Sequence, residues 1–192
     1  MSKRKAAFLD RDGVINYDRA YVHRWDQFEF LPGAIEAMRK LKKAGYALVV
    51  VTNQSGIARG YYTEEQYQEL TECIKQALTE SGTPLDAVYH CPHHPQGVVL
   101  KLSFDCDCRK PAPGMILLAE RDMDLFLPNS LMIGDKPSDI EAARAAGVGR
   151  AFWVSSNNSE SVLVACQADG YFGSLLECVN DVLQNNILLD NE

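Results

Sequence analysis

Hydrophobic positions along the chain follow two alternating patterns, short continuous apolar runs and longer stretches with apolar residues at helical spacing. Residues 5–9 and 47–51 are runs of the first kind, and the second run is short, continuous and rich in valine, as expected of a strand buried on both faces. Between them, residues 35–46 have helical spacing that stops at Gly45. The order strand, helix, strand is the basic unit of a parallel sheet.

The same alternation continues along the rest of the sequence. Residues 63–82 predict a helix that opens with a capping box, Thr63 and Gln66, and closes at Gly82. Further strands are predicted at 86–91, 130–135 and 151–155, and further helices at 112–125, 136–149 and 174–185. We therefore expect an α/β fold of three layers, a Rossmann-like parallel sheet with right-handed crossovers and helices on both faces.

The length of 192 residues fits one domain, because single domains commonly run about 100 to 200 residues. The hydrophobic fraction of 46% and the charged fraction of 23% are typical of a globular protein with a buried core. No repeat, low-complexity tract or interdomain linker interrupts the pattern, so residues 1–192 are expected to form a single domain. One long stretch, residues 91–111, lacks a regular pattern, and loops of that length in compact domains are usually functional.

The net charge of −7, with lysines and arginines scattered along the chain, argues against nucleic acid as a partner. The negative net charge is still compatible with an anionic small substrate, since nearby cationic side chains and a metal ion can make the potential inside a cleft positive. The N-terminus lacks the apolar run of a signal peptide, and no stretch approaches the ~20 apolar residues of a membrane span. We expect a cytoplasmic protein without a membrane partner and, in the absence of an obvious coiled coil, a monomer.

Polar side chains follow three of the predicted strands. They are Asp10 and Asp12, then Thr52 and Asn53, then Asp135 and Lys136. Ligands of open parallel sheets bind at the carboxyl ends of the strands, so these groups should converge. Clustered carboxylates repel one another unless a cation lies between them, and oxygen ligands of this kind suit Mg²⁺. A single aspartate at a strand end is more often a turn or cap residue, and that alternative applies best to Asp135 alone.

Four segments together resemble the ordered motifs of the haloacid-dehalogenase-like (HAD) phosphatases. They are DRDGVIN, VVTNQSG, CRKPAPGM and MIGDKPSDI, and they span nearly the whole chain. The resemblance implies that Asp10 is a nucleophile that forms an aspartyl phosphate. It also implies that Asp12 protonates the leaving oxygen and then acts as base for the hydrolytic water. Phosphoryl transfer needs such an oriented oxygen nucleophile, a proton source and positive charge around the phosphoryl oxygens.

The same resemblance assigns further roles around the phosphoryl group. Thr52 matches the hydroxyl that holds the phosphoryl oxygens, and Lys110 matches the lysine that neutralises charge on the phosphate and on the nucleophile. The expected Mg²⁺ ligands are the carboxylates of Asp10 and Asp135 and the backbone carbonyl of Asp12. The roles of two residues stay open: Asp139 is expected to orient the metal shell rather than to bind the ion directly, and Lys136 contacts the metal site or is a solvated lysine.

Cysteines and a histidine form two tight pairs, Cys91 with His93 and Cys106 with Cys108. This spacing can wrap one tetrahedral Zn²⁺ with three sulfurs and one nitrogen, and four protein ligands make such a site structural. A disulfide is the alternative, which a reducing compartment disfavours.

His90 and His94 are rival ligands to His93 by position, but the Cys-x-His spacing of the resembling subfamily selects His93. Zn²⁺ would then staple the cysteine loop, residues 91–108, and hold the segment that begins with Arg109. The other three cysteines lie in apolar or helix-like stretches and are expected in the core: Cys73, Cys166 and Cys178.

The segment between Asp12 and the second predicted strand leaves room for a flap but not for a separate cap domain, so short loops should determine specificity. The resemblance narrows the substrate to the 7-phosphate of D-glycero-D-manno-heptose 1,7-bisphosphate or to histidinol phosphate. Similarity in DRDGVIN, in TNQSGIARGYYTEEQ and in the long cysteine loop favours the heptose, a precursor of the lipopolysaccharide core. A catalytically idle zinc-binding module remains a third alternative, against which the complete catalytic set argues.

The expected substrate pocket combines loop residues with two cations. Arg109 is a planar fork suited to a second phosphate or to sugar hydroxyls, and Lys110 is a point charge suited to the reacting phosphate. Arg59 and Tyr61 lie nearby in sequence without an assigned place. The remaining positions implied by the resemblance are Asp18, Arg19, Ala20, Tyr21, Thr52, Asn53, Gln54 and Ser55.

Overall fold

The computed structural model describes residues 3–155 and 167–189. Its strands are β1 Ala6–Leu9, β2 Ala47–Asn53, β3 Ala87–Cys91, β4 Leu131–Gly134, β5 Arg150–Val154 and β6 Gly170–Phe172. Its helices are α1 Ala34–Lys43, α2 Glu64–Glu80, α3 Gly114–Met123, α4 Pro137–Ala146 and α6 Leu175–Leu189. Short 3₁₀ turns occur at Trp25–Gln27, Leu100–Leu102 and Leu127–Asn129. Every predicted helix and strand is present, with ends within four residues of the prediction.

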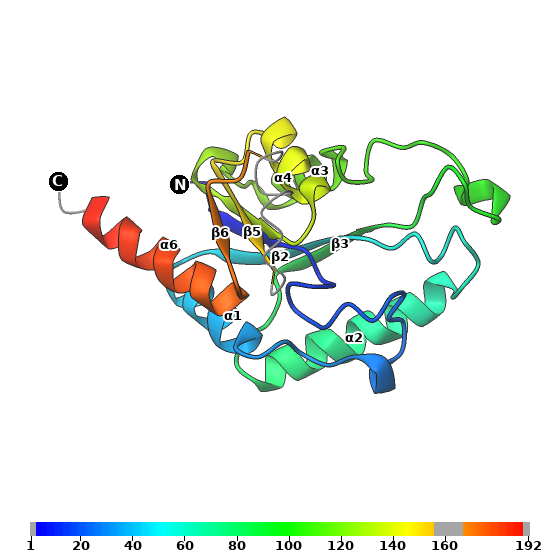
Figure 1. The fold of residues 1–192 in the computed structure, drawn as a ribbon, viewed down its shortest axis with the longest axis horizontal. Coiled ribbons are helices and arrows are strands. Elements are labelled where there is room, and N and C mark those ends of the chain that lie inside the picture. The colour runs from blue at the N-terminus through cyan, green and yellow to red at the C-terminus, as the bar shows by residue number, and fades with distance from the viewer. Residues whose placement is uncertain (1–2, 156–166, 190–192) are drawn as a thin grey trace.

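The strands form one six-stranded sheet in the order β3-β2-β1-β4-β5-β6, and every pair is parallel. Helices α1, α2 and α6 cover one face and α3 and α4 cover the other, which gives three layers (Figure 1). In β1, Ala7 and Leu9 belong to the first core and Ala6 and Phe8 to the second, since successive side chains of a strand point to opposite faces. The predicted three-layer α/β fold with a parallel sheet is confirmed.

Local sequence signals explain the ends of the helices. Thr63 and Gln66 form the predicted capping box. The backbone nitrogen of Gln66 donates to Thr63 Oγ1 at 3.2 Å, and the backbone nitrogen of Thr63 donates to Gln66 Oε1 at 2.9 Å. Past the end of α4, Gly147 adopts the left-handed conformation, with φ of +81°, which glycine accepts without steric cost.

Two differences from the prediction concern the sheet. β2 continues through Thr52 and Asn53, because these residues pair with His90 and Cys91 of β3, so they lie on the strand and not after it. β6 was not predicted, because a three-residue, partly exposed edge strand has no hydrophobic periodicity.

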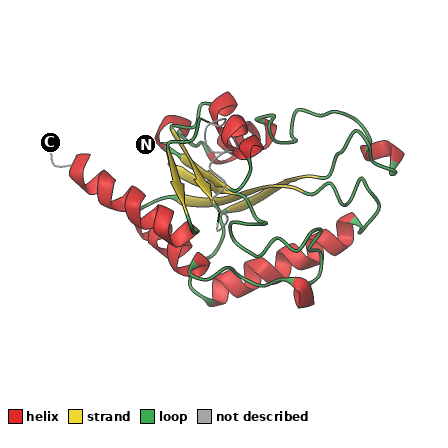
Figure 2. Ribbon diagram, in the orientation of Figure 1, coloured by secondary structure: helices red, strands yellow, loops and turns green. Residues whose placement is uncertain are grey.

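The connections position the site at one edge of the sheet. Residues 10–33, between β1 and α1, hold a single short turn of helix, Trp25–Gln27, so no large cap is inserted there. A long loop between β3 and α3 extends away from the sheet (Figure 2). Among the described residues, no helix has the length and apolar character needed to cross a membrane.

Candidate active site

The carboxyl ends of β1 and β4 bring three aspartates together. Asp10 follows β1, and its backbone nitrogen donates to Ile133 of β4 at 3.1 Å. Asp135 follows β4, and Asp139 lies in the first turn of α4. One carboxylate oxygen of each of the three lies within 4.8 Å of the others. The predicted convergence of Asp10 with Asp135 is present, and Asp139 joins them.

Lys110 supplies a buried positive charge at this cluster. Its Nζ lies 2.9 Å from Asp10 Oδ1 and 2.6 Å from Asp139 Oδ1, and it donates to the Val51 carbonyl at 2.7 Å. Burial acts to lower the pKa of Lys110, but the two carboxylates outweigh it and raise the pKa above its usual value, so the ammonium stays charged. The Asn53 side chain makes two hydrogen bonds with the backbone of Lys110. The Lys110 nitrogen donates to Asn53 Oδ1 at 3.1 Å, and Asn53 Nδ2 donates to the Lys110 carbonyl at 3.0 Å.

Asp139, whose role the sequence left open, joins two parts of the site. Besides pairing with Lys110, its Oδ2 accepts hydrogen bonds from the backbone nitrogens of Asp135 at 3.1 Å and Lys136 at 3.0 Å. A Cβ at position 134 would lie 2.2 Å from the Asp139 Cβ, so glycine is required there for the approach. The carboxylate therefore fixes both the lysine and the loop that carries Asp135.

Asp135 has the environment of a cation ligand. Its Oδ1 is buried without a hydrogen-bond donor among the described residues, and the Lys136 ammonium lies 3.8 Å away. Burial, followed by the charge of Asp10, raises the pKa of Asp135 to about 8. A buried carboxylate that lacks donors is costly unless a cation compensates it, so the carboxylate pair of Asp10 and Asp135 fits a divalent metal ion. Gly13 permits this packing, because a Cβ there would lie 2.2 Å from Asp135 Oδ2.

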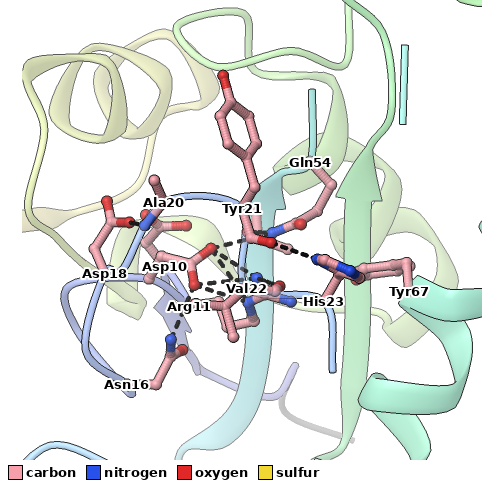
Figure 3. Close-up of polar contacts among 12 residues, drawn as sticks. Asp10, Arg11, Asn16, Asp18, Ala20, Tyr21, Val22, His23, Gln54 and Tyr67 are labelled. Carbon is pink, nitrogen blue, oxygen red and sulfur yellow. Dashed lines mark hydrogen bonds and ion pairs between the residues drawn. The ribbon is translucent and has the colours of Figure 1, made fainter. Parts of the chain in front are cut away.

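The Asp12 carboxylate accepts hydrogen bonds from three side chains, those of Arg11, Asn16 and Gln54, which are labelled in Figure 3. Arg11 Nη2 donates to its Oδ2 at 2.9 Å, and Asn16 Nδ2 donates to its Oδ1 at 2.9 Å. Gln54 Nε2 also reaches Oδ2, at 3.2 Å. Arg11 is itself buried, and its guanidinium also donates to the Val22 carbonyl at 2.8 Å. The Asp12 carboxylate therefore has a defined orientation.

A cleft of about 540 Å³ opens in front of Asp12 and Lys110. Lys136 lines it and pairs with Asp18 at 3.4 Å, which links the loop after β1 to the loop after β4. Arg109 lies on the wall, with Nη1 3.4 Å from the His93 carbonyl. The other predicted residues on the lining are Asp18, Ala20, Tyr21, Asn53, Gln54 and Ser55, and the lining adds Tyr62, Pro111 and Ser138.

Two predicted substrate residues are absent from the cleft lining, the buried Thr52 and the exposed Arg19. Arg19 forms an exposed ion pair with Glu29. Ala20 and Tyr21 both have φ of +56°, a conformation uncommon for residues with a side chain. Sequence reasoning missed Tyr62, since nothing in the local pattern separates this buried tyrosine from its exposed neighbour Tyr61.

The cysteine loop brings its four predicted ligands into one cluster. The sulfurs lie 3.5 Å apart for Cys91 and Cys106 and 3.3 Å apart for each of the other two pairs, and His93 Nδ1 is 3.3 Å from Cys108 Sγ. A tetrahedron with Zn–S bonds of ~2.3 Å has edges of about 3.8 Å, close to these separations. All five cysteines that the structure describes are free, so the disulfide alternative is absent from this part of the chain.

Metal binding to this cluster would require the loss of thiol protons. Burial raises the pKa of Cys91 and raises that of Cys108 to about 11, so without a metal these thiols keep their protons. The rival histidines point elsewhere: His90 Nε2 pairs with Glu64 at 2.8 Å, and His94 Nε2 lies 2.9 Å from Arg59 Nη2.

The loop between the two ligand pairs exposes two of its apolar side chains. Val98 is 72% exposed and Leu100 is 90% exposed. Of the remaining cysteines, Cys178 is fully buried, Cys73 is partly buried and Cys166 lies outside the described residues.

Comparison with known proteins agrees with this geometry. Residues 7–100 match the model of a haloacid dehalogenase-like hydrolase family, and residues 107–178 match a related HAD-hydrolase-like model. The D-glycero-beta-D-manno-heptose-1,7-bisphosphate 7-phosphatase of Escherichia coli K12 is 50% identical over 172 residues, which cover 90% of each chain. The D-glycero-alpha-D-manno-heptose-1,7-bisphosphate 7-phosphatase of Photorhabdus laumondii is 46% identical over 160 residues, which cover 83% of this chain and 87% of the other.

A solved structure extends the likeness to three dimensions. The D,D-heptose 1,7-bisphosphate phosphatase of B. bronchiseptica, crystallised with magnesium and phosphate, superposes with a TM-score of 0.81 at 32% identity. The match covers 94% of this chain and 99% of that one. The chain belongs to the haloacid dehalogenase-like hydrolase family, as its four sequence motifs predicted.

Proposed function

We propose that this protein is a Mg²⁺-dependent phosphatase that converts D-glycero-D-manno-heptose 1,7-bisphosphate to heptose 1-phosphate. The observation that carries the proposal is an open cleft lined by Asp12 and Lys110, with Asp10 2.9 Å from the Lys110 ammonium, in a chain about half identical to phosphatases named for this substrate. The product would supply nucleotide-activated heptose for the lipopolysaccharide core. The enzyme would act in the cytoplasm as a single-domain monomer.

In the first chemical step, an Asp10 carboxylate oxygen attacks the 7-phosphorus in line, and the bond between phosphorus and the sugar oxygen breaks. Asp12 gives its proton to the departing oxygen, so the sugar leaves as an alcohol. The Lys110 ammonium, 2.9 Å from Asp10, offsets the negative charge that gathers on the phosphoryl oxygens. An aspartyl phosphate remains on the enzyme.

In the second step, water attacks the phosphorus of the aspartyl phosphate while Asp12 accepts its proton. The bond between phosphorus and Asp10 breaks, inorganic phosphate leaves, and both aspartates return to their initial states. Thr52 is the hydroxyl that would hold the phosphoryl oxygens through both steps. Arg109, on the cleft wall, would bind the second phosphate or the sugar hydroxyls.

Two metal ions complete the proposal. Mg²⁺ would be held by the Asp10 and Asp135 carboxylates and the Asp12 backbone carbonyl, and when bound it supplies positive charge to the phosphoryl oxygens. The buried Asp135 oxygen that lacks a donor supports this assignment. Zn²⁺ would be held by Cys91, His93, Cys106 and Cys108 and would have a structural role.

Phosphate release from heptose 1,7-bisphosphate and from histidinol phosphate, measured side by side with Mg²⁺ and then with EDTA, tests the proposal. We expect rapid, metal-dependent loss of the 7-phosphate alone, identified by NMR of the sugar product, and slow release from histidinol phosphate. Separate assays of the α and β anomers would establish the anomeric preference. Faster turnover of histidinol phosphate would contradict the substrate assignment, and no release from either ester would favour an idle zinc-binding module.

Mg²⁺ binding should release a proton at neutral pH. In the metal-free site the pKa of Asp135 is raised to about 8, so at pH 7 its carboxyl group is mostly protonated, and the metal ligand must be the carboxylate. We expect about one proton released per Mg²⁺ at pH 7 and close to none at pH 9, with affinity rising as the pH increases toward 8. Titration calorimetry in buffers of different ionisation enthalpy measures the number of protons released, and Asp135→Asn, which removes the ionisable carboxyl group, is the control. Binding at pH 7 without proton release would contradict the assignment.

A further inference from the structure

The side-chain amide of Gln54 connects two groups of the reaction centre. Its Nε2 donates to Thr52 Oγ1 at 2.8 Å and to Asp12 Oδ2 at 3.2 Å. Its Oε1 accepts a hydrogen bond from the Tyr62 hydroxyl at 2.6 Å. A glutamine amide has two N–H donors, so both donors are used inside the protein. Although Gln54 lies on the cleft lining, it is 2% exposed.

Asp12 and Tyr62 together set which way this amide points. A carboxylate oxygen only accepts hydrogen bonds, so the NH₂ group faces Asp12 and Thr52, and Oε1 accepts from the Tyr62 hydroxyl. The tyrosine ring is itself held in place, stacked on His23 with centroids 4.8 Å apart and planes 5° from parallel. Gly56 lies against the ring, where a Cβ would be 2.1 Å from a ring carbon. The orientation of the amide is therefore built into the loop after β2.

The amide has a separate consequence for each of its two acceptors. Thr52 Oγ1 accepts from Gln54, so the hydroxyl hydrogen of Thr52 points away from the amide and can be donated to a phosphoryl oxygen. Asp12 Oδ2 is shared between Gln54 and Arg11, which places the carboxylate as a rigid unit beside the cleft. One side chain thus sets the direction of the phosphate-binding hydroxyl and the position of the acid.

We propose that Gln54 is a positioning residue that couples the acid and base Asp12 to Thr52, and that it does not bind the substrate through its own polar atoms. This inference rests on the proposed function for the identity of the acid. It replaces the expectation, from the family resemblance, that Gln54 is a substrate contact. The two roles predict different kinetics, because a misplaced acid harms the departure of a poor leaving group while a lost contact weakens binding.

Gln54→Leu removes all three hydrogen bonds and keeps a side chain of similar size. We expect kcat/KM for heptose 1,7-bisphosphate, whose leaving group is an alkoxide, to fall about 30-fold, because a small displacement of a catalytic group has a large effect on rate. For p-nitrophenyl phosphate, whose leaving group needs little protonation, the fall should be about threefold. In the Asp10→Asn background, where substrate is not consumed, the Kd for heptose 1,7-bisphosphate should change less than about twofold.

Two further variants serve as controls. Gln76→Leu makes the same substitution on the exposed face of α2 and should leave both kcat/KM values unchanged. Tyr62→Phe keeps both donors of Gln54 and removes one of the contacts that orient them, so its effect should have the same leaving-group dependence and a smaller size. The double variant of Gln54 and Tyr62 should be no worse than Gln54→Leu, because Tyr62 acts through the amide.

Weaker substrate binding in the Asp10→Asn background, with equal losses for the two esters, would overturn the inference and make Gln54 a substrate contact. Equal losses with unchanged binding and a lowered Tm would overturn it in favour of a purely structural role. Failure of the proposed function is distinguishable, since the wild-type enzyme would then not hydrolyse heptose 1,7-bisphosphate. The comparison of alkyl and aryl leaving groups would then be made with whichever alkyl phosphate the wild-type enzyme accepts.

Discussion

Asp10→Asn should reduce turnover of heptose 1,7-bisphosphate by on the order of 10⁴-fold or more, because an amide cannot attack phosphorus and the covalent intermediate cannot form. The fold should survive the change, since asparagine has the same shape and Lys110 keeps its contact with Asp139 at 2.6 Å. Rapid acid quench during turnover should trap a phosphorylated wild-type protein, with the label on Asp10. The variant should give no phosphoprotein under the same conditions.

Asp124→Asn is the matched control for this variant. Asp124 lies beyond the end of α3 with φ of +50°, a conformation that asparagine also tolerates, and its carboxylate is exposed. Its turnover should equal that of the wild type. Mass spectrometry of the Asp10→Asn protein would exclude deamidation back to aspartate. Unchanged turnover in a verified Asp10→Asn sample would show that this residue is not the nucleophile.

Cys106→Ser should remove bound zinc and impair catalysis without altering Asp10. The loop between the ligand pairs exposes Val98 and Leu100, and its protein contacts are few: Leu102 packs against a small cluster at Ile57, and Val98 and Val99 donate to the Ala58 carbonyl. Loss of the metal should release Arg109, which directly follows the last ligand, Cys108. We expect zinc content to fall from one equivalent to near none and kcat/KM to fall about tenfold or more, since losing the support of a positioned side chain has a large effect on rate.

The loss of zinc should be visible independently of activity. Amide hydrogen exchange should increase in residues 92–107 and stay unchanged in β1 and β4, because the core that buries those strands does not depend on the loop. Cys73→Ser, the same substitution on α2, should retain both zinc and activity. Full activity in a demonstrably zinc-free Cys106→Ser preparation would refute the structural role of the metal.

Much of the fold could be predicted from the sequence because the burial of each residue is encoded in its hydrophobic pattern. The short, valine-rich run at 47–51 predicted a buried strand, and Thr63 with Gln66 marked the start of α2 through hydrogen bonds within one turn. The convergence of Asp10 and Asp135 followed from the rule that parallel strands end at a common edge. The cluster of the cysteine loop followed from the close spacing of Cys106 and Cys108 and of Cys91 and His93.

Other features depend on contacts between distant parts of the chain. Asp139 meets Lys110 across 29 residues of sequence, and Gln54 meets Asp12 across 42. No local pattern specifies such pairs, because they depend on where two separate loops lie after the sheet has assembled. Arg19 is a residue whose predicted place differs from its observed one. Its position in the loop after β1 predicted a substrate contact, but its side chain pairs with Glu29 at the surface.

The sequence by itself therefore determined the order of helices and strands, the edge of the sheet where the candidate site lies, and the two groups of candidate metal ligands. These features depend on periodicity and on short spacings between residues, and both can be recognised in the linear sequence. The tertiary structure alone decided the strand order, the edge strand β6, the pairing of Lys110 with Asp139 and the orientation of Asp12 by Gln54. Side-chain geometry across loops is set by packing between elements, and packing exists only once the chain has folded.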